Sequence, residues 1–278
     1  MSGGYTCSIA TREHPVDMPR DYDDDDSDND SMCGTLDEPD LEAAPGQILR
    51  AVEAAGVGAY PGRGLKWKVG QTINVKFMGG TPDTHKTVAL IVTTWEDRAN
   101  ISFNFSTKGD GDIRIAFDPK KGWSSYIGTR ALRVPKDKPT MNLGYRQSTP
   151  TKSFVRHVLH EFGHALGLQH EHQSPASPIL WDEEKVYREY ASTNGWSRST
   201  IRDNILKKVN STNYSKFDPK SIMLYNVDKR LTKDGRGINH PGTLSETDEE
   251  FIRNMYPFPE SSSESESGSN SDADSDSD

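Results

Sequence analysis

Cysteine is nearly absent from this chain of 278 residues: Cys7 and Cys33 are the only two, and both lie near the N-terminus. A disulfide framework is therefore excluded for the rest of the sequence. Any fold formed there has to be held together by an apolar core, and the chain is long enough for one large domain or two small ones.

Long apolar runs are missing as well. No stretch approaches the roughly 20 apolar residues that a membrane-spanning helix needs. The N-terminal stretch MSGGYTCSIATREHP lacks the charged and apolar regions of a secretory signal. We therefore expect no association with membranes, and the residues alone favour an intracellular location.

The net charge of −9 is unevenly distributed along the chain. Residues 1–59 hold 14 acidic and 3 basic side chains, residues 259–278 hold 7 acidic and no basic ones, and residues 60–258 hold 21 acidic against 30 basic. The two acidic ends are too polar to form a core and are predicted to be largely disordered. We expect one folded domain over residues 60–258, preceded by a candidate pro-region and followed by a low-complexity tail.

The basic surplus of residues 60–258 is a reason to consider nucleic-acid binding. Its lysines and arginines are spread along the segment without a recognition motif, which indicates a solvated surface. No nucleic-acid partner is therefore expected. A scaffold whose acidic ends bind basic partners is an alternative that the composition leaves open.

Hydrophobic spacing predicts a sheet with helices packed on it. A stretch after Pro82 has apolar residues at helical spacing, and Asp83 is suited to start that helix. A second helical pattern runs from Phe154 to Leu166, and Gly167 follows where a helix end favours glycine. Strands combined with two such helices indicate an α/β fold. The expected strands, each with alternating or short apolar patterns, are 72–78, 101–105, 112–117, 123–128 and 140–144.

The second predicted helix contains the densest group of histidines in the chain, in the stretch VLHEFGHALGLQHEHQ at residues 158–173. His160 and His164 are four residues apart, so their rings project from the same face of a helix. A turn at Gly167 lets His170 return to the same point. Three imidazoles that converge on one position provide the open coordination of a catalytic zinc ion.

Glu161 follows the first of these histidines and is placed to take a proton from a zinc-activated water molecule. The full pattern HExxHxxGxxH fixes five positions, which makes it far more specific than HExxH alone. The other interpretation is a helix whose histidines lie in the core or in solvent and never bind a metal. We expect one catalytic Zn²⁺ at His160, His164 and His170.

A second motif, SIMLY at residues 221–225, lies further along the chain. An elongated zinc motif with a later methionine turn resembles the metzincin zinc endopeptidases, and SIMLY resembles the astacin type of this turn. The stretches WSSYIG, HEH and LSETDEEFIRNMYP are also similar to astacin-like enzymes, above all to the cysteine-free ones of microbes. The resemblance covers roughly residues 60–258.

This resemblance implies a fold and several residue roles. The fold would have an upper subdomain with a twisted mixed sheet and two long helices, an irregular lower subdomain, and an active-site cleft between them. Met223 would form the hydrophobic base beneath the zinc, and Tyr225 would be a switchable fifth ligand that donates to the oxyanion. WSSYIG would be an edge strand that pairs with an extended substrate. Its expected substrate-binding residues are Trp123, Ser124, Ser125 and Tyr126.

The expected function is that of a zinc-dependent endopeptidase, acting as a monomer on a protein or peptide substrate. The alternative is a zinc-binding module that recognises extended peptides without cleaving them. Astacins usually hold disulfides and are usually secreted, whereas this sequence has no cysteine pair in the expected domain and no visible signal, so the location stays open. Glu171 occupies the position of the family glutamate that contacts the trimmed N-terminus.

Overall fold

The structure is a computed structural model, and it describes residues 34–36, 65–146, 149, 151–209, 215–239 and 242–259. These residues belong to one structural unit, Ser31–Asp278, while the unit Met1–Asp30 lies outside the described part. The acidic ends for which disorder is predicted lie almost entirely outside the described residues, so that prediction stays untested.

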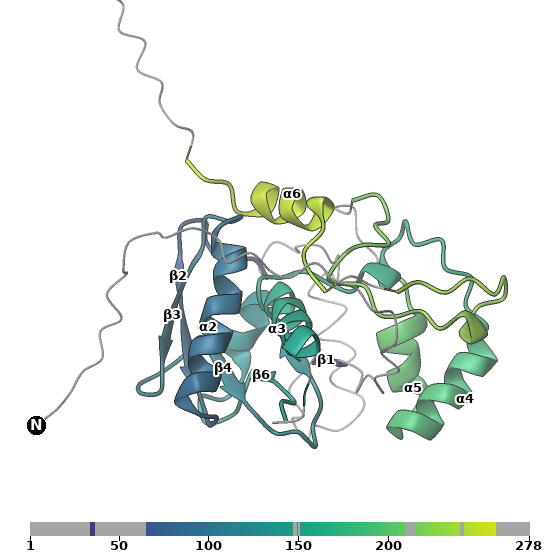
Figure 1. The fold of residues 1–278 in the computed structure, drawn as a ribbon, viewed down its shortest axis with the longest axis horizontal. Helices are drawn as coiled ribbons and strands as arrows, with labels where there is room; N and C mark the ends of the chain where they lie inside the picture. The colour runs from purple at the N-terminus through teal and green to yellow at the C-terminus, as the bar shows by residue number, and fades with distance from the viewer. Residues whose placement is uncertain are drawn as a thin grey trace, which may run out of the picture. The chain divides into compact units, whose positions relative to one another are not determined.

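A six-stranded mixed sheet is the framework of the described chain (Figure 1). The strand order is β1-β5-β6-β4-β2-β3, in which β5 and β6 are antiparallel and all other neighbours are parallel. Such mixed sheets are common in folds that combine strands and helices. The strands are β1 (Gly34–Leu36), β2 (Thr72–Phe77), β3 (Ser102–Ser106), β4 (Ile113–Ala116), β5 (Ser124–Tyr126) and β6 (Met141–Asn142).

The five strands predicted from the sequence are all present, each within a few residues of its expected bounds. In β2 the side chains of Ile73, Val75 and Phe77 are buried, whereas the residues between them are more exposed. This period of two lets one face of the strand join the core. The sequence does not predict β1, because a strand of three residues in an acidic segment has no alternation to detect.

Two helices of 15 residues each, α2 (Pro82–Glu96) and α3 (Thr151–Ala165), run side by side against the sheet (Figure 1). The side chain of Thr81 caps α2 by accepting a backbone N–H of the first turn. Asp83 therefore lies inside the first turn instead of starting the helix. The two long helices of the expected α/β fold are confirmed.

Buried aromatic side chains fix α3 to its neighbours. Trp95 of α2 is fully buried and donates its indole N–H to the Leu159 carbonyl of α3 at 3.1 Å. On the sheet side, the ring of Phe162 meets that of Phe103 edge to face, with centroids 5.3 Å apart. Rings in this arrangement attract each other beyond simple burial. The helix that carries the histidine motif is thus anchored on two sides.

The end of α3 reverses the chain at Gly167, as the sequence predicts. Gly167 has a φ of 108°, which glycine adopts without strain. Its N–H donates to the carbonyl of His164 at 2.8 Å, and the N–H of Leu168 donates to that of Gly163 at 2.9 Å. This pair of hydrogen bonds is the Schellman motif, which satisfies the last carbonyl groups of a helix.

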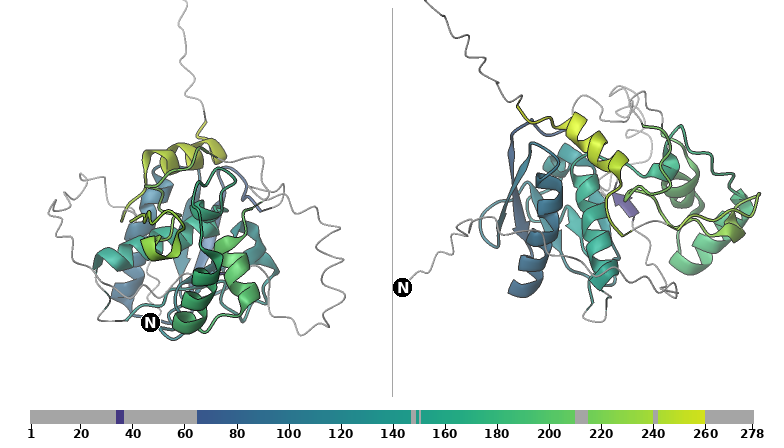
Figure 2. Two further views of the ribbon diagram at one scale, coloured as in Figure 1. Left: turned by 90° about the vertical axis from the view of Figure 1, so that its right-hand side faces the viewer. Right: turned by 45° about the horizontal axis from the view of Figure 1, so that its top comes forward.

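Beyond Gly167 the chain consists of short helices and loops; the described residues there form two isolated β-bridges and no strand. This agrees with the irregular lower subdomain that the resemblance implies. The last helix, α6 (Glu246–Met255), returns to the end of α3 (Figure 2). There the Tyr256 hydroxyl donates to the Leu166 carbonyl at 2.7 Å. Among the described residues, no helix has the length and apolarity needed to cross a bilayer. The helices after α3 are α4 (Glu183–Asn194), α5 (Arg198–Ile201) and α6 (Glu246–Met255), and the shorter turns are η1 (Gly128–Arg133), η2 (Glu171–Gln173), the π-turn η3 (Arg202–Leu206) and η4 (Lys229–Leu231).

Arg114, in β4, holds the segment that connects β5 to β6. Its side chain is fully buried, and its guanidinium donates to five backbone carbonyl groups over distances of 2.7 to 3.5 Å. Three of these hydrogen bonds are buried, and buried carbonyl groups need such donors because water does not reach them. The acceptors are the carbonyl groups of Gly111, Ala131, Val134, Pro135 and Lys138.

Replacing Arg114 by methionine is expected to lower the free energy of unfolding by about 3 kcal/mol, because several buried carbonyl groups lose their donor. The measurement is a denaturant titration, in which the midpoint should fall while the slope stays constant. Arg133→Met, at an exposed arginine of the same segment, is the control and should change stability by less than about 0.5 kcal/mol. Equal stability of the two variants would contradict the role given to Arg114.

Candidate metal centre

The buried face of α3 carries two histidines one helical turn apart. The rings of His160 and His164 are nearly perpendicular, at 87°, and their centroids are 4.7 Å apart. Only 5% of His160 and none of His164 is exposed. The prediction that both rings share one face of a helix is therefore confirmed.

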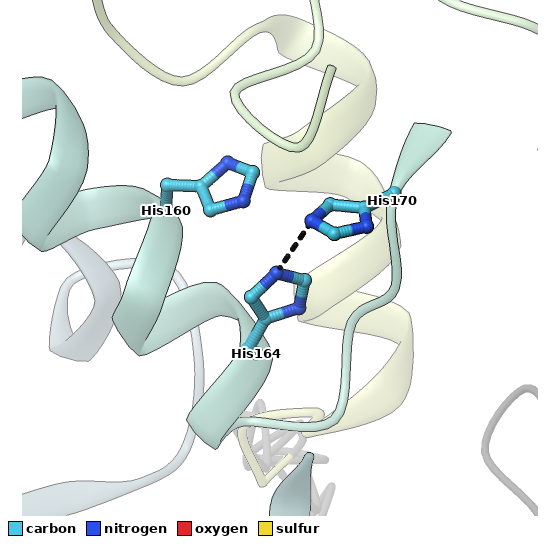
Figure 3. A group of neighbouring side chains, drawn as sticks. All are labelled: His160, His164 and His170. Atoms are coloured by element: carbon cyan, nitrogen blue, oxygen red, sulfur yellow. Dashed lines mark hydrogen bonds between the residues drawn. The ribbon is translucent and has the colours of Figure 1, made fainter. Parts of the chain in front are cut away.

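His170 reaches the same place through the turn at Gly167. The nitrogen atoms that the three histidines offer to a metal lie within 4.8 Å of one another, and the Nε2 atoms of His164 and His170 are 3.0 Å apart. Figure 3 shows the three rings facing a common space. The structure thus brings together all three histidines that the sequence motif selects.

A backbone carbonyl group fixes the orientation of each of the first two rings. Nδ1 of His160 is 2.8 Å from the Ile222 carbonyl oxygen, and Nδ1 of His164 is 2.8 Å from that of Leu168. A carbonyl oxygen can only accept a hydrogen bond, so Nδ1 carries the proton in both neutral rings. Nε2 therefore keeps its lone pair and faces the shared space.

Gln173 orients the third ring with its side-chain amide. Its Oε1 is 3.3 Å from Nδ1 of His170, while its amide nitrogen donates to the carbonyl groups of Asp203 at 2.7 Å and Lys207 at 3.0 Å. These two bonds determine which end of the amide is oxygen, so Nδ1 of His170 is also a donor. Gln173 is a residue that sequence reasoning missed, and its place at the end of the histidine-rich stretch was the only signal.

The π-turn η3 and the residue after it supply the carbonyl groups that hold this side of the site. Besides the two acceptors of Gln173, the Asn204 carbonyl accepts from Nε2 of His172 at 3.0 Å. The His172 ring lies nearly parallel to that of His170, with centroids 5.0 Å apart. π-Turns occur frequently at functional sites. This one is linked to the third histidine through Gln173, whose amide binds both the turn and Nδ1 of His170.

Burial keeps the rings of His164 and His170 neutral near pH 7. Desolvation lowers the pKa of His164 to about 4, and desolvation together with the neighbouring histidines holds the pKa of His170 well below its usual value. Two neutral rings protonated at Nδ1 bring two Nε2 lone pairs within 3.0 Å of each other, which is repulsive without a cation between them. Three neutral imidazoles are the ligand set of a catalytic zinc ion with an open fourth position. The residues therefore fit a zinc ion.

Met223 lies beneath the histidines, where the turn of residues 221–225 passes α3. Its side chain is 2% exposed. Gly163 stands between the two histidines of the helix, and a Cβ added there would overlap the sulfur of Met223. The glycine in HEFGH thus makes room for the methionine side chain, and the role of Met223 as a hydrophobic base stays a prediction.

The two expected catalytic side chains also lie near the histidines. The Tyr225 ring is 4.2 Å from that of His170 and 5.8 Å from that of His160, measured between centroids. Glu161 is fully buried on α3, directly after His160. Sequence reasoning therefore selected side chains that the fold gathers into one region.

The segment expected to bind substrate forms β5, but β5 is not the outermost strand. β1, the purple strand in Figure 2, pairs with it in parallel. Gly34 lies opposite Ser124, and Leu36 lies opposite Tyr126. The four side chains from Trp123 to Tyr126 are 1% to 8% exposed. Trp123 stacks on the ring of His157, with centroids 4.4 Å apart and an angle of 13°. Its indole therefore belongs to the core, and the backbone of β5 is the part that meets another strand.

Comparisons with known proteins agree with this site and fold. Residues 63–255 match the model of the peptidase family Astacin. A solved structure of myroilysin is 42% identical, covers 71% of this chain and 98% of its own, and has a TM-score of 0.68. A second, crystal structure of myroilysin is 39% identical, covers 81% of this chain and all of its own, and has a TM-score of 0.57. Among curated proteins there is no match.

The family match spans the sheet, the histidine motif and the methionine turn. The two myroilysin structures share more than a third of their residues with this chain over most of their own length. Peptidases of this family use zinc, and their substrates are proteins or peptides. This chain belongs to the astacin family and is a zinc metallopeptidase.

Proposed function

We propose that the chain is an endopeptidase in which His160, His164 and His170 hold one zinc ion for the hydrolysis of peptide bonds by water. The observation that carries this proposal is the fixed acceptor at each Nδ1, which leaves three Nε2 lone pairs directed at one space. Three protein ligands leave a fourth position for water or substrate.

Glu161 is the proposed general base. Bound zinc would supply a Lewis acid that brings the pKa of a water molecule toward about 7. Glu161 takes the proton of that water and later gives it to the leaving amine. Its place on a long, buried helix, one residue after His160, keeps its carboxylate at a constant position relative to the metal ligands.

Tyr225 is the proposed donor to the oxyanion. Its ring is in contact with the rings of His170 and His172, at centroid distances of 4.2 and 4.7 Å. These two contacts hold the ring in place and thereby position its hydroxyl group. A donor directed at the oxygen where charge develops stabilises the transition state more than the substrate.

The backbone of β5 is the proposed binding surface for an extended substrate, through the hydrogen bonds of an added strand. In the full chain β1 already pairs with this strand. We therefore assign residues 1–59 as a pro-region that keeps the enzyme latent, ahead of a catalytic domain of residues 60–258 and a tail of residues 259–278. A monomer that needs neither nucleic acid nor membrane is the form we expect.

One observation favours a second function. The pairing of β1 with β5 is itself the capture of an extended peptide, which a zinc-binding module without catalysis would also perform. The presence of Glu161 beside the first histidine favours the peptidase, since a binding module has no need of a buried carboxylate there. Variants of Glu161 separate the two functions.

Glu161→Gln is expected to lower kcat/KM by about 10⁴-fold because it removes the base, and Tyr225→Phe by about 10²-fold because it removes one donor. Both variants should retain one zinc ion per chain, determined by metal analysis. The assay is cleavage of an unfolded protein, with the full chain and with the chain lacking residues 1–59. Full activity of Glu161→Gln would refute the mechanism, and zinc binding without cleavage by the wild type would favour the binding module.

Disruption of β1 is expected to activate the full chain. The double variant Thr35→Pro/Leu36→Pro removes two successive N–H groups, and since these point alternately to either side of a strand, one of them faces β5. Activity should rise about tenfold, as expected for the loss of one or two hydrogen bonds of about 1 kcal/mol each. Thr35→Val/Leu36→Val keeps the N–H groups and should remain latent. Equal activity of both variants and of the chain lacking residues 1–59 would disprove the pro-region.

A further inference from the structure

Asp248 is a buried carboxylate that the proposed mechanism does not use. It lies in the first turn of α6 and is 6% exposed. Its Oδ1 accepts from the Ser221 hydroxyl at 2.7 Å, and its Oδ2 accepts from the N–H groups of Ile222 at 2.7 Å and Ser245 at 3.0 Å. Burial raises the pKa of Asp248, and the hydrogen bonds oppose that rise. Three donors around one carboxyl group favour its ionised form.

Two of these donors belong to the turn beneath the histidines. The Ser221 hydroxyl gives its proton to Asp248 and accepts the N–H of Met223 at 3.0 Å. That N–H belongs to the peptide group whose carbonyl oxygen is that of Ile222. The same carbonyl oxygen accepts from Nδ1 of His160 at 2.8 Å. The peptide group between Ile222 and Met223 is thus held at both ends.

All donors in this series point the same way. His160 donates to the peptide group, the peptide group donates to Ser221, and Ser221 donates to Asp248. Hydrogen bonds arranged head to tail polarise one another, and a negative charge at the end strengthens each of them. A histidine whose Nδ1–H is drawn toward a carboxylate is a more basic and better oriented metal ligand at Nε2.

We propose that Asp248 is a positioning residue of the zinc centre, which orients His160 and raises its affinity for zinc through Ser221 and the peptide group between Ile222 and Met223. The inference rests on the proposed zinc ligands, but it concerns metal affinity and not peptide hydrolysis. It also gives a role to the stretch LSETDEEFIRNMYP, which marks the end of the domain.

A purely local role would be the capping of α6. Asp248 and Ser245 do form a capping box, in which the Asp248 N–H donates to the Ser245 hydroxyl at 3.0 Å. That box uses only one of the three hydrogen bonds that the carboxylate accepts. The other two, to Ser221 and Ile222, go to a segment more than twenty residues earlier in the chain.

Three substitutions in the full chain separate the two roles. Asp248→Asn keeps an oxygen for the N–H groups of Ile222 and Ser245 but presents an NH₂ group to Ser221, which reverses that hydrogen bond. Ser221→Ala removes the hydroxyl while leaving the carboxylate and the cap of α6 in place. Ser245→Ala is the control, because it weakens the cap without touching the series that leads to His160.

The measurement is the zinc dissociation constant, determined by competition with a chromophoric chelator, together with the thermal midpoint of the metal-free protein. Asp248→Asn and Ser221→Ala should each bind zinc roughly 10 to 100 times more weakly than the wild type. Their combination should be no weaker than the weaker single variant, because both break one series. Ser245→Ala should lower the thermal midpoint by roughly 2–4 °C and keep the zinc affinity of the wild type.

Wild-type zinc affinity in Asp248→Asn would overturn the proposal, and so would a loss in Ser245→Ala as large as that in Asp248→Asn. If Asp248→Asn does not fold, the test is made with Ser221→Ala. A zinc affinity of Ser221→Ala equal to that of the wild type would also overturn the proposal. The outcome is independent of catalysis, since a wild type that binds zinc without cleaving peptides would refute the proposed function and leave the affinities to be compared.

Discussion

The metal centre depends on the hydrogen-bond acceptor that each histidine finds for its Nδ1–H. An imidazole has two nitrogen atoms, and only the one without a proton can bind a metal. The acceptors are the carbonyl groups of Ile222 and Leu168 and the amide of Gln173. They come from the methionine turn, the end of α3 and η2, so these three parts must be folded before the lone pairs meet. Folding of these parts and metal binding are therefore coupled.

The part of this site that sequence predicts is the part that local geometry determines. The spacing of His160 and His164 and the position of Gly167 follow from the period of one helix and the conformation of its end. The Ile222 carbonyl has no such signal, since every residue carries the same group and only the tertiary fold brings it to His160. Gln173 is recognisable only after η3 places two carbonyl groups at its amide. The same division applies to the fold, where periodic strands and helices are predictable and the order of the strands is not.

The edge of β5 illustrates a second limit. The sequence predicts a strand there and the resemblance implies a free edge, whereas β1 from the acidic N-terminal segment pairs with it. Strand pairing uses backbone groups and depends little on side chains. The sequence of three residues such as Gly34–Leu36 therefore does not indicate that they pair with β5. In the described chain, the segment that covers this surface is β1.

Helix α6 supplies a further hydrogen-bond acceptor, which acts on the metal centre indirectly. Among the described residues, the hydrogen-bond partners of Asp248 are Ser221, Ile222 and Ser245 and include no histidine, yet its carboxylate closes a series of hydrogen bonds that starts at His160. Linkage is reciprocal: if docking of α6 raises the affinity for zinc by some factor, bound zinc must stabilise the docking of α6 by the same factor. A ligand that binds only the folded state stabilises it in proportion to the logarithm of its concentration. Zinc would therefore stabilise the docking of α6 against the methionine turn, although its three proposed ligands all lie within residues 160–170.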